Sequence, residues 1–224
     1  MFIGHFGLGL AAKKAAPSVS LGLLFVACQA ADLIWPVLVL LGIEQVAIAP
    51  GVTAMTPLNF ISYPYSHSLV MLCIWGAALG AVYAAIARGP LTASITLALL
   101  VVSHWVLDVV THRPDMPVTP SGSTRLGLGL WNSIPATIAV EMVMLAAGVW
   151  LYLGAAAPRT RGQRIGLWAL VAFLLIIYVA NVFGPPPPSA NAVAWSGVGM
   201  WLIILWAWAV DRSRSGDGQK RSAR

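Results

Sequence analysis

The chain has 224 residues, of which 59% are hydrophobic and 9% are charged, and its mean hydropathy is +0.83. Soluble domains are roughly half apolar and about a quarter charged, so this composition excludes a water-soluble globule and also a disordered chain. The net charge of +6 comes from basic residues that lie between apolar runs rather than in one patch, and we expect no nucleic-acid partner. The composition predicts a single all-α polytopic membrane domain over residues 1–210 and a disordered basic tail over residues 211–224.

The apolar runs are long enough to cross a bilayer as helices, which requires about 20 residues. They predict six transmembrane helices, at Ser18–Gly42, Ser66–Ala87, Leu91–Thr111, Ser133–Gly154, Ile165–Phe183 and Val193–Val210. Residues 1–12 are too short to cross at about 1.5 Å per residue, so they are expected to lie in the interface or to enter the membrane as a half-helix. Their lysines follow the apolar residues, the reverse of a secretory signal, and we expect this segment to be retained.

The distribution of basic residues predicts an orientation. With six crossings, eleven of the thirteen Lys and Arg residues fall on one side, and only Arg113 and Arg125 fall on the other. The positive-inside rule places the eleven, and with them the C-terminal tail, in the cytoplasm. The connections 43–65, 112–132 and 184–192 are then expected to face outward.

Ionisable residues inside membrane segments are costly and suggest a functional site. All four histidines and three carboxylates lie in or at the edges of the apolar runs: His5, His67, His104, His112, Asp32, Asp108 and Glu141. Any one of them alone is more simply explained by hydrogen bonds between helices. Helix rise places them at compatible depths, His5 only if the first segment is a half-helix. Together they predict one polar site in the outer half of the membrane.

The sharpest motif extends from Ser103 to His112. His104, Asp108 and His112 are each four residues apart, so they form one stripe along a helix. A histidine and a carboxylate at this spacing can bind one metal ion, and His112 would more readily reach a second ion. The alternative is a structural, hydrogen-bonded stripe. Pro114 is expected to end this helix because it disfavours the α conformation of the residue before it.

The other candidate residues lie on separate segments. Ser66 is predicted to cap the following helix and to place His67 in its first turn, where the helix dipole favours the neutral, metal-binding imidazole; a histidine that only caps the helix is the alternative. Asp32 precedes Pro36, which cannot donate to the carbonyl of residue 32, so a kink is expected at Asp32. Glu141 has three open roles: metal ligand, general base or buried hydrogen-bonding residue.

The order of these motifs resembles a known family. The motifs are Gly4-His5, Asp32, Ser66-His67-Ser68, Ser103-His104 through Asp108 and His112, and Gly129-Leu130-Trp131-Asn132-Ser133. In the order of these motifs, the chain resembles membrane-bound metal-dependent hydrolases, also described as LexA-binding inner-membrane hydrolases. That family is distantly similar to the zinc-dependent phospholipase C and single-strand nuclease superfamily. The resemblance implies a bacterial-type inner (plasma) membrane and the metal ligands His5, Asp32, His67, His104, Asp108 and His112.

The sequence therefore predicts a membrane-embedded hydrolase that holds one or two divalent ions, with zinc as the first choice and with Asp108 and Glu141 as catalytic candidates. Thr137 stands where the superfamily's second metal-binding histidine would precede Glu141, so a third ion is not expected. A metal ion lowers the pKa of a bound water towards about 7. The predicted substrate is a phosphoester of a lipid or lipid-like molecule near the outer leaflet, and membrane lipids are the expected partners.

Two other functions fit the same residues. An intramembrane metal-ion or proton transporter would use the polar cluster as an ion site, although the inner halves of the predicted helices contain almost no ionisable residues. A non-catalytic scaffold would use the cluster only to hold helices together.

Overall fold

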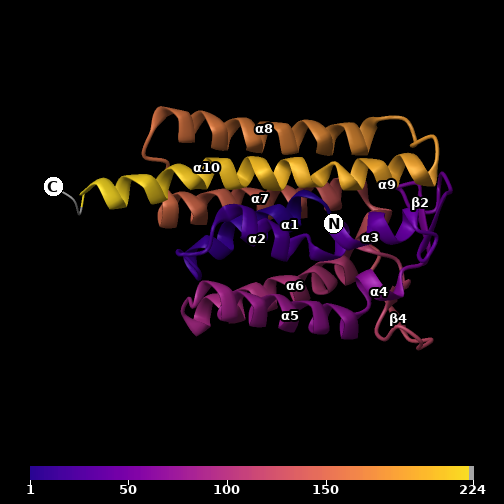
Figure 1. Cartoon of the computed structure of the whole chain (residues 1–224). Helices are drawn as coiled ribbons and strands as arrows, with labels where there is room; N and C mark the ends of the chain where they lie inside the picture. The colour runs from indigo at the N-terminus through magenta and orange to yellow at the C-terminus, as the bar shows by residue number, and fades with distance from the viewer. Residues whose placement is uncertain (222–224) are drawn as a thin grey trace.

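In the part of the chain that the structure describes, five helical segments are long and apolar enough to cross a membrane. They are α5 (Leu69–Ala87), α6 (Leu91–Thr111), α7 (Ile134–Ala156), α8 (Arg161–Phe183) and the segment Ala190–Asp211, which contains α9 (Ala190–Val198) and the first part of α10 (Met200–Arg221). The computed structural model, which describes residues 1–221 and the side chains of residues 1–211, arranges them side by side along one axis (Figure 1). The all-α helical bundle predicted from the composition is confirmed.

The first predicted span is broken in two. It consists of α2 (Leu21–Cys28) and α3 (Ala30–Leu40), which meet at an angle of 60°, and it supplies a sixth crossing if the pair is counted as one span. The bend lies at Gln29, whereas α3 continues through Asp32 and Pro36. The kink expected at Asp32 is therefore wrong in position. A break leaves carbonyl groups without helical partners, and the one on Cys28 accepts a hydrogen bond from His104.

The N-terminal segment lies inside the bundle. It forms α1 (Ile3–Ala11) and the 3₁₀ turn η1 (Ala12–Lys14), and α1 packs against α7, α2 and α6. Ile3, Phe6 and Leu10 are buried. Gly7 and Gly148 let the backbones of α1 and α7 approach so closely that a Cβ at residue 148 would lie 2.1 Å from the Gly7 carbonyl oxygen. The segment thus lies among the other helices of the bundle, which favours the half-helix over the interfacial helix.

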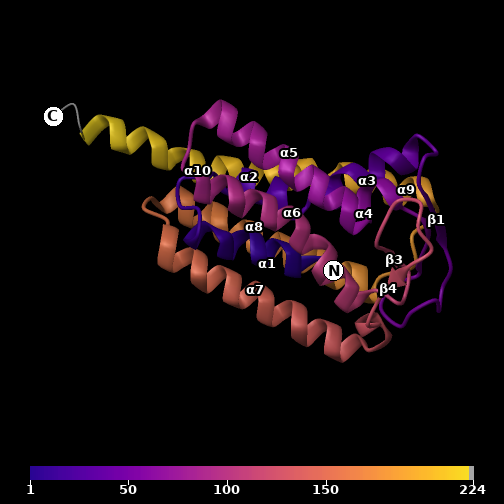
Figure 2. The ribbon, with the colours of Figure 1, turned by 90° about the horizontal axis from the view of Figure 1, so that it is seen from below.

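The connections separate by length at the two ends of the bundle. Short ones join α1 to α2, α5 to α6 and α7 to α8 at one end (Figure 1). At the other end are two antiparallel hairpins, β1 (Gln45–Ile48) with β2 (Leu58–Ser62) and β3 (Met116–Pro117) with β4 (Arg125–Leu126). Figure 2 shows the hairpins together beyond the ends of the helices. The short helix α4 (Pro64–His67) and the 3₁₀ turn η2 (Leu130–Asn132) belong to the same end.

Hydrogen bonds join the first hairpin to η2 and the second hairpin to α5 and α6. The Met55 N–H donates to the Trp131 carbonyl, the Val70 N–H donates to the Val118 carbonyl, and the Trp105 indole donates to the Pro117 carbonyl. They form an ordered cover over this end of α6.

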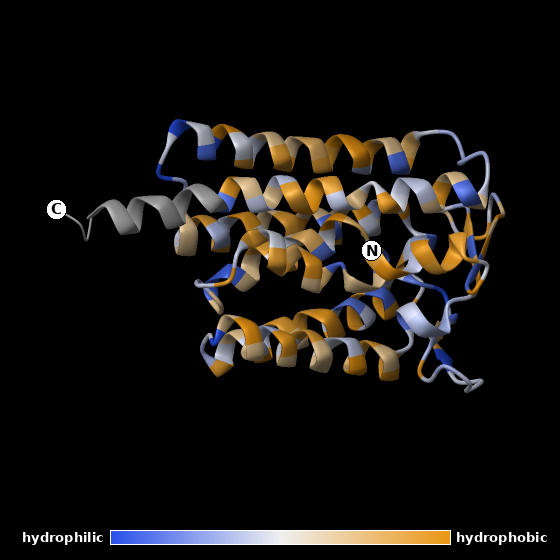
Figure 3. Cartoon of the chain, viewed as in Figure 1, coloured by the Kyte–Doolittle hydropathy of each residue, from blue (hydrophilic) through white to orange (hydrophobic). Residues whose placement is uncertain are grey.

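At the opposite end a buried ion pair connects η1 to α10. The Lys13 ammonium lies 2.6 Å from Asp211 Oδ2, and the same oxygen accepts the Leu21 N–H. Figure 3 shows apolar residues along the helices and hydrophilic residues mainly in the connections at both ends. The predicted tail over residues 211–224 begins within α10; its side chains beyond residue 211 and residues 222–224 lie outside the described part of the chain.

Candidate metal centre

The stripe on α6 is the centre of the polar cluster. As expected, α6 ends at Thr111, with His112 as its C-cap and Pro114 just beyond. Asp108 Oδ2 lies 3.2 Å from His104 Nε2 and 3.9 Å from His112 Nε2. Because Asp108 is almost completely buried, its carboxylate meets the two imidazoles away from water.

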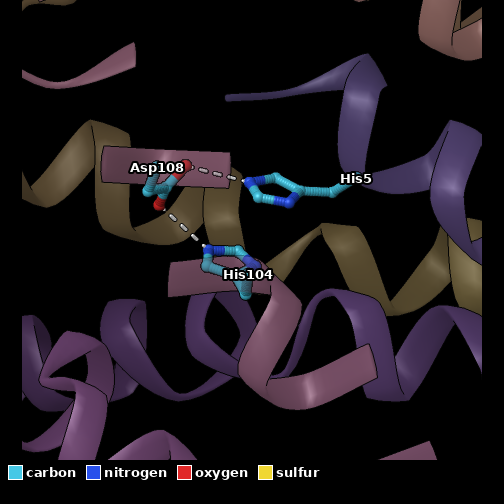
Figure 4. Close-up of side chains that lie close together, drawn as sticks. All are labelled: His5, His104 and Asp108. Atoms are coloured by element: carbon cyan, nitrogen blue, oxygen red, sulfur yellow. Dashed lines mark hydrogen bonds and ion pairs between the residues drawn. The ribbon is translucent and has the colours of Figure 1, made fainter. Parts of the chain in front are cut away.

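The helix α1 contributes a third imidazole. His5 Nε2 lies 3.0 Å from Asp108 Oδ1, and the rings of His5 and His104 stack in parallel with their centroids 3.8 Å apart. Figure 4 shows both rings directed at Asp108 from different helices. The α-amino group of Met1 also lies 2.6 Å from Asp108 Oδ1. The ligand atoms of His5, His104 and Asp108 are close enough to one another to bind a single ion.

A second group of ligand atoms shares His104 with the first. Asp32 from α3 places Oδ1 3.4 Å from His67 Nε2 and 3.7 Å from His104 Nε2. His67 Nε2 is also 3.8 Å from Asp108 Oδ2. Asp32, His67 and His104 form a second triad that could hold an ion. The Asp32 side chain is 24% exposed, whereas the other members of both triads are at most 3% exposed, so the cluster is accessible at Asp32.

Hydrogen bonds on the outer side of three imidazoles fix their tautomers. His104 Nδ1 lies 2.8 Å from the Cys28 carbonyl, and His112 Nδ1 lies 3.0 Å from Asp115 Oδ1. Both partners only accept, so Nδ1 carries the proton in each ring. His67 Nδ1 contacts Ser66 Oγ, which donates its own proton to Glu44 Oε2. In all three rings the neutral form therefore leaves the Nε2 lone pair facing the centre of the cluster.

The segment around His67 differs from the sequence prediction. Ser68 caps α5, while Ser66 and His67 lie in α4, whose first residue is Pro64. Ser66 is not a cap because the Glu44 carboxylate binds its hydroxyl group and also its N–H. His67 consequently sits at the end of a separate short helix rather than in the first turn of α5. By contrast, Ser133 caps α7 at the position where a helix was predicted to begin.

Asp115 connects His112 to the hairpin cover. Its carboxylate accepts hydrogen bonds from His112, from the Tyr63 hydroxyl at 2.8 Å and from Arg113 at 3.0 Å. Burial alone would raise the pKa of Asp115, but these hydrogen bonds and the neighbouring imidazole hold it below its ordinary value. Asp115 therefore remains a charged acceptor, which is the form that keeps the proton of His112 on Nδ1.

The residues fit a divalent metal ion. His104 Nε2 is buried and has no hydrogen-bond partner among the described residues, although two carboxylate oxygens lie within 4 Å of it. A lone pair that faces carboxylate oxygens in a buried site needs a cation between them, either a proton or a metal ion. Imidazole nitrogens together with carboxylate oxygens form a donor set that suits zinc, and also manganese or iron.

Glu141 lies beside the cluster and outside both triads. Its Oε2 accepts the N–H groups of Phe2 and Gly4, at 2.8 and 3.1 Å, and it thereby caps the N-terminus of α1. Among the three roles left open for Glu141, these contacts describe a residue that holds α1, and with it His5, in place. Its assignment as a ligand or general base stays a prediction.

Two carboxylates of the site were missed by the sequence reasoning. Glu44 and Asp115 lie in the connections that carry the hairpins and act on His67 and His112 from outside. The composition gave one signal: the chain has only seven Asp and Glu residues, so each one outside the C-terminal tail was a candidate for the site. The i, i+3 spacing of His112 and Asp115 was a second signal.

Comparisons of the chain with family models, curated proteins and solved structures gave no match. The function is accordingly inferred from the arrangement of these side chains.

Proposed function

We propose that the protein is a membrane-embedded, metal-dependent hydrolase that acts on a phosphoester of a lipid or lipid-like substrate. The observation that carries the proposal is the arrangement around Asp108: four imidazoles and two carboxylates from α1, α3, α4 and α6 lie around one buried point. Three of these imidazoles have their outer nitrogen occupied and their inner nitrogen free for a ligand.

One or two divalent ions, with zinc as our first choice, would be held by the residues of the two triads. Because His104 has only Nε2 free, it would bind one of these ions and not both. His5, His104 and Asp108 would form one site, and Asp32 and His67 would contribute to the other. His112 would add a further nitrogen near Asp108. A bound divalent ion supplies Lewis acidity to a phosphoryl oxygen and to the attacking water. Asp32, the accessible member of the cluster, lies where substrate would meet it.

The position of the site supports a lipid substrate. The triads lie towards the hairpin end of the bundle. His112, the outermost of the proposed ligands, is the C-cap of α6 and directly precedes the loop that carries β3 and β4. Six of the thirteen Lys and Arg residues lie in or beside the short connections at the other end, and only two lie in the connections at the hairpin end. We therefore assign the end with short connections, and the C-terminus, to the cytoplasm. The site would then lie near the outer headgroups of a bacterial-type inner membrane, where lipid phosphoesters are located. The resemblance in motif order to membrane-bound metal-dependent hydrolases points the same way.

Metal analysis of the purified protein is the first test. We expect about one to two zinc ions per chain, and we expect His104→Ala and Asp108→Ala to lose them without preventing membrane insertion. Ser103→Ala is the matched control, because the Ser103 hydroxyl bonds the Leu100 carbonyl within α6 and does not contact the site. Full metal content in both site variants would refute the proposal.

Turnover is the second test. A panel of phospholipids and phosphomonoesters should reveal release of phosphate or of a phosphorylated headgroup that stops on chelation and resumes when zinc is added. The protein would be an ion transporter instead if it bound zinc, cleaved nothing on the panel and transported zinc into proteoliposomes. The Asp32→Asn variant should then lose this transport.

A further inference from the structure

A groove between α3 and α5 lies next to the metal centre and is not explained by it. The groove encloses about 290 Å³, and every side chain that lines it is aliphatic or a tryptophan. It exists because α5 packs almost entirely on α6: Leu72, Gly76 and Gly80 are the residues that α5 buries. The flank of α5 that carries Trp75 and Ala78 is left unpacked opposite α3.

Several residues that line the groove are neighbours, along the chain, of ligands of the metal centre. On α3, Leu33 follows Asp32 directly, and on α6, Val101 lies one helical turn before His104. On α5, the Trp75 indole donates to the Tyr65 carbonyl at 3.0 Å, and Tyr65 belongs to α4, the helix that carries His67. The groove is therefore lined by residues that adjoin Asp32 and His104 in the chain and by one that is bonded to the helix of His67.

The size and chemistry of the groove select its occupant. Its lining provides no set of polar partners for ordered water. Because its walls belong to helices that are apolar enough to cross a membrane, the molecules that surround it are lipid chains. One water molecule occupies roughly 30 Å³ in the liquid, and a methylene group is about the same size. The volume of the groove therefore corresponds to about ten methylene groups.

We propose that this groove binds one hydrocarbon chain of the substrate and that the substrate is therefore a membrane lipid rather than a soluble phosphoester. This inference rests on the proposed function. The chain would enter sideways from the bilayer and lie along α3 and α5, with the headgroup at Asp32 and His67.

Photolabelling tests chain binding independently of activity. The probe is phosphatidylglycerol with a diazirine in one acyl chain, incorporated at low density in phosphatidylcholine vesicles that contain the protein. We expect label on the α3 peptide that contains Ala30 and Leu33. Ala78→Trp fills the groove and should reduce this label about tenfold, the loss equivalent to about two methylene contacts. Ala77→Trp, the neighbouring exposed alanine outside the lining, should leave it unchanged. Equal labelling in the two variants would overturn the proposal.

Turnover gives the second readout. With an active enzyme, Ala78→Trp should raise KM for a long-chain phospholipid and leave kcat for a short-chain, water-soluble analogue unchanged, while metal content stays that of the wild type. Ala30→Leu, which fills the groove from the opposite wall, should act in the same way if Ala78→Trp fails to fold. A wild-type protein that binds metal and cleaves both substrates, with the same KM values in the groove variants, would overturn the groove alone. A wild-type protein without metal or turnover would overturn the proposed function, and the photolabel would still decide the groove.

Discussion

The close contact between α1 and α7 sets the position of His5, so we expect Gly148→Ala to weaken metal binding although residue 148 is not part of the site. A Cβ at this position would lie 2.1 Å from the Gly7 carbonyl oxygen, whereas real Cβ atoms essentially never come closer than 3.0 Å. The two helices would have to separate by about 0.9 Å, the difference between these distances. His5 lies two residues from Gly7 on the same nine-residue helix and would move with it.

The expected magnitude follows from this displacement. Overpacking of a closely packed contact costs about 1–3 kcal/mol, and the better helix propensity of alanine returns about 1 kcal/mol. The net loss of unfolding free energy should therefore be at most about 2 kcal/mol. A functional site tolerates displacements of only about 0.5 Å, so His5 would leave the ligand set. We expect zinc affinity to fall about tenfold or more, the scale of losing one orienting partner of a metal ligand.

Gly154→Ala is the matched control because it lies on the same helix and a Cβ there would meet nothing within 4 Å. Zinc titration of the metal-free protein in detergent, followed by thermal unfolding of both variants, measures the two effects separately. If Gly148→Ala and Gly154→Ala bind zinc with the same affinity, the contact between α1 and α7 does not position His5, and the reasoning is wrong.

Three other variants test individual contacts. Lys13→Ala should lower the unfolding free energy by about 1.5–3 kcal/mol, the scale of a hydrogen bond between charged groups, because it removes the ammonium that pairs with the buried Asp211 carboxylate. Zinc affinity should not change, since this ion pair lies at the far end of the bundle. A loss measured in zinc binding rather than in thermal unfolding would contradict this. Glu141→Gln keeps an oxygen for the N–H groups of α1, so turnover should stay within about threefold of wild type, whereas a drop of about a hundredfold or more would identify a general base. Ser66→Ala removes the acceptor of His67 Nδ1 and should weaken zinc binding by about 10–100-fold. Ser68→Ala removes only the cap of α5 and should lower thermal stability alone. Equal zinc affinity in the two serine variants would refute a positioning role for Ser66.

The residues on regular helices could be predicted from the sequence because helix geometry is repetitive. The spacing of His104, Asp108 and His112 placed them on one face of α6, and the end of α6 at Thr111 followed from Pro114. Helix rise placed Asp32 and His67 at a matching depth, and they meet at 3.4 Å. These predictions required only that the apolar runs be helices that lie side by side.

The parts that could not be predicted depend on contacts between segments that are distant in sequence. Nothing local to Ser66 shows that Glu44, 22 residues earlier, binds its hydroxyl group, so a serine after a proline looked like a cap. The break at Gln29 carries no proline, and the hydrogen bond that satisfies the Cys28 carbonyl there comes from His104, 76 residues later. A tertiary hydrogen bond can thus decide where a helix bends when local sequence would favour another position.

The bundle contains two buried polar clusters, and the difference between them distinguishes a binding site from a structural contact. At the end with short connections, Lys13 donates to Asp211, so that opposite charges are matched within the protein. Around Asp108, His67, His104 and His112 direct their protons outward to Ser66, Cys28 and Asp115 and direct their lone pairs inward towards carboxylate oxygens. A cluster that only joined helices would gain stability from the first arrangement. In the second, the Met1 ammonium pairs with Asp108 Oδ1, but Asp108 Oδ2 and Asp32 Oδ1 face imidazole lone pairs, and buried acceptors that face one another are destabilising. This part of the cluster is stable when a cation lies between the nitrogens and the oxygens, which fits the proposed ion-binding function better than a scaffold.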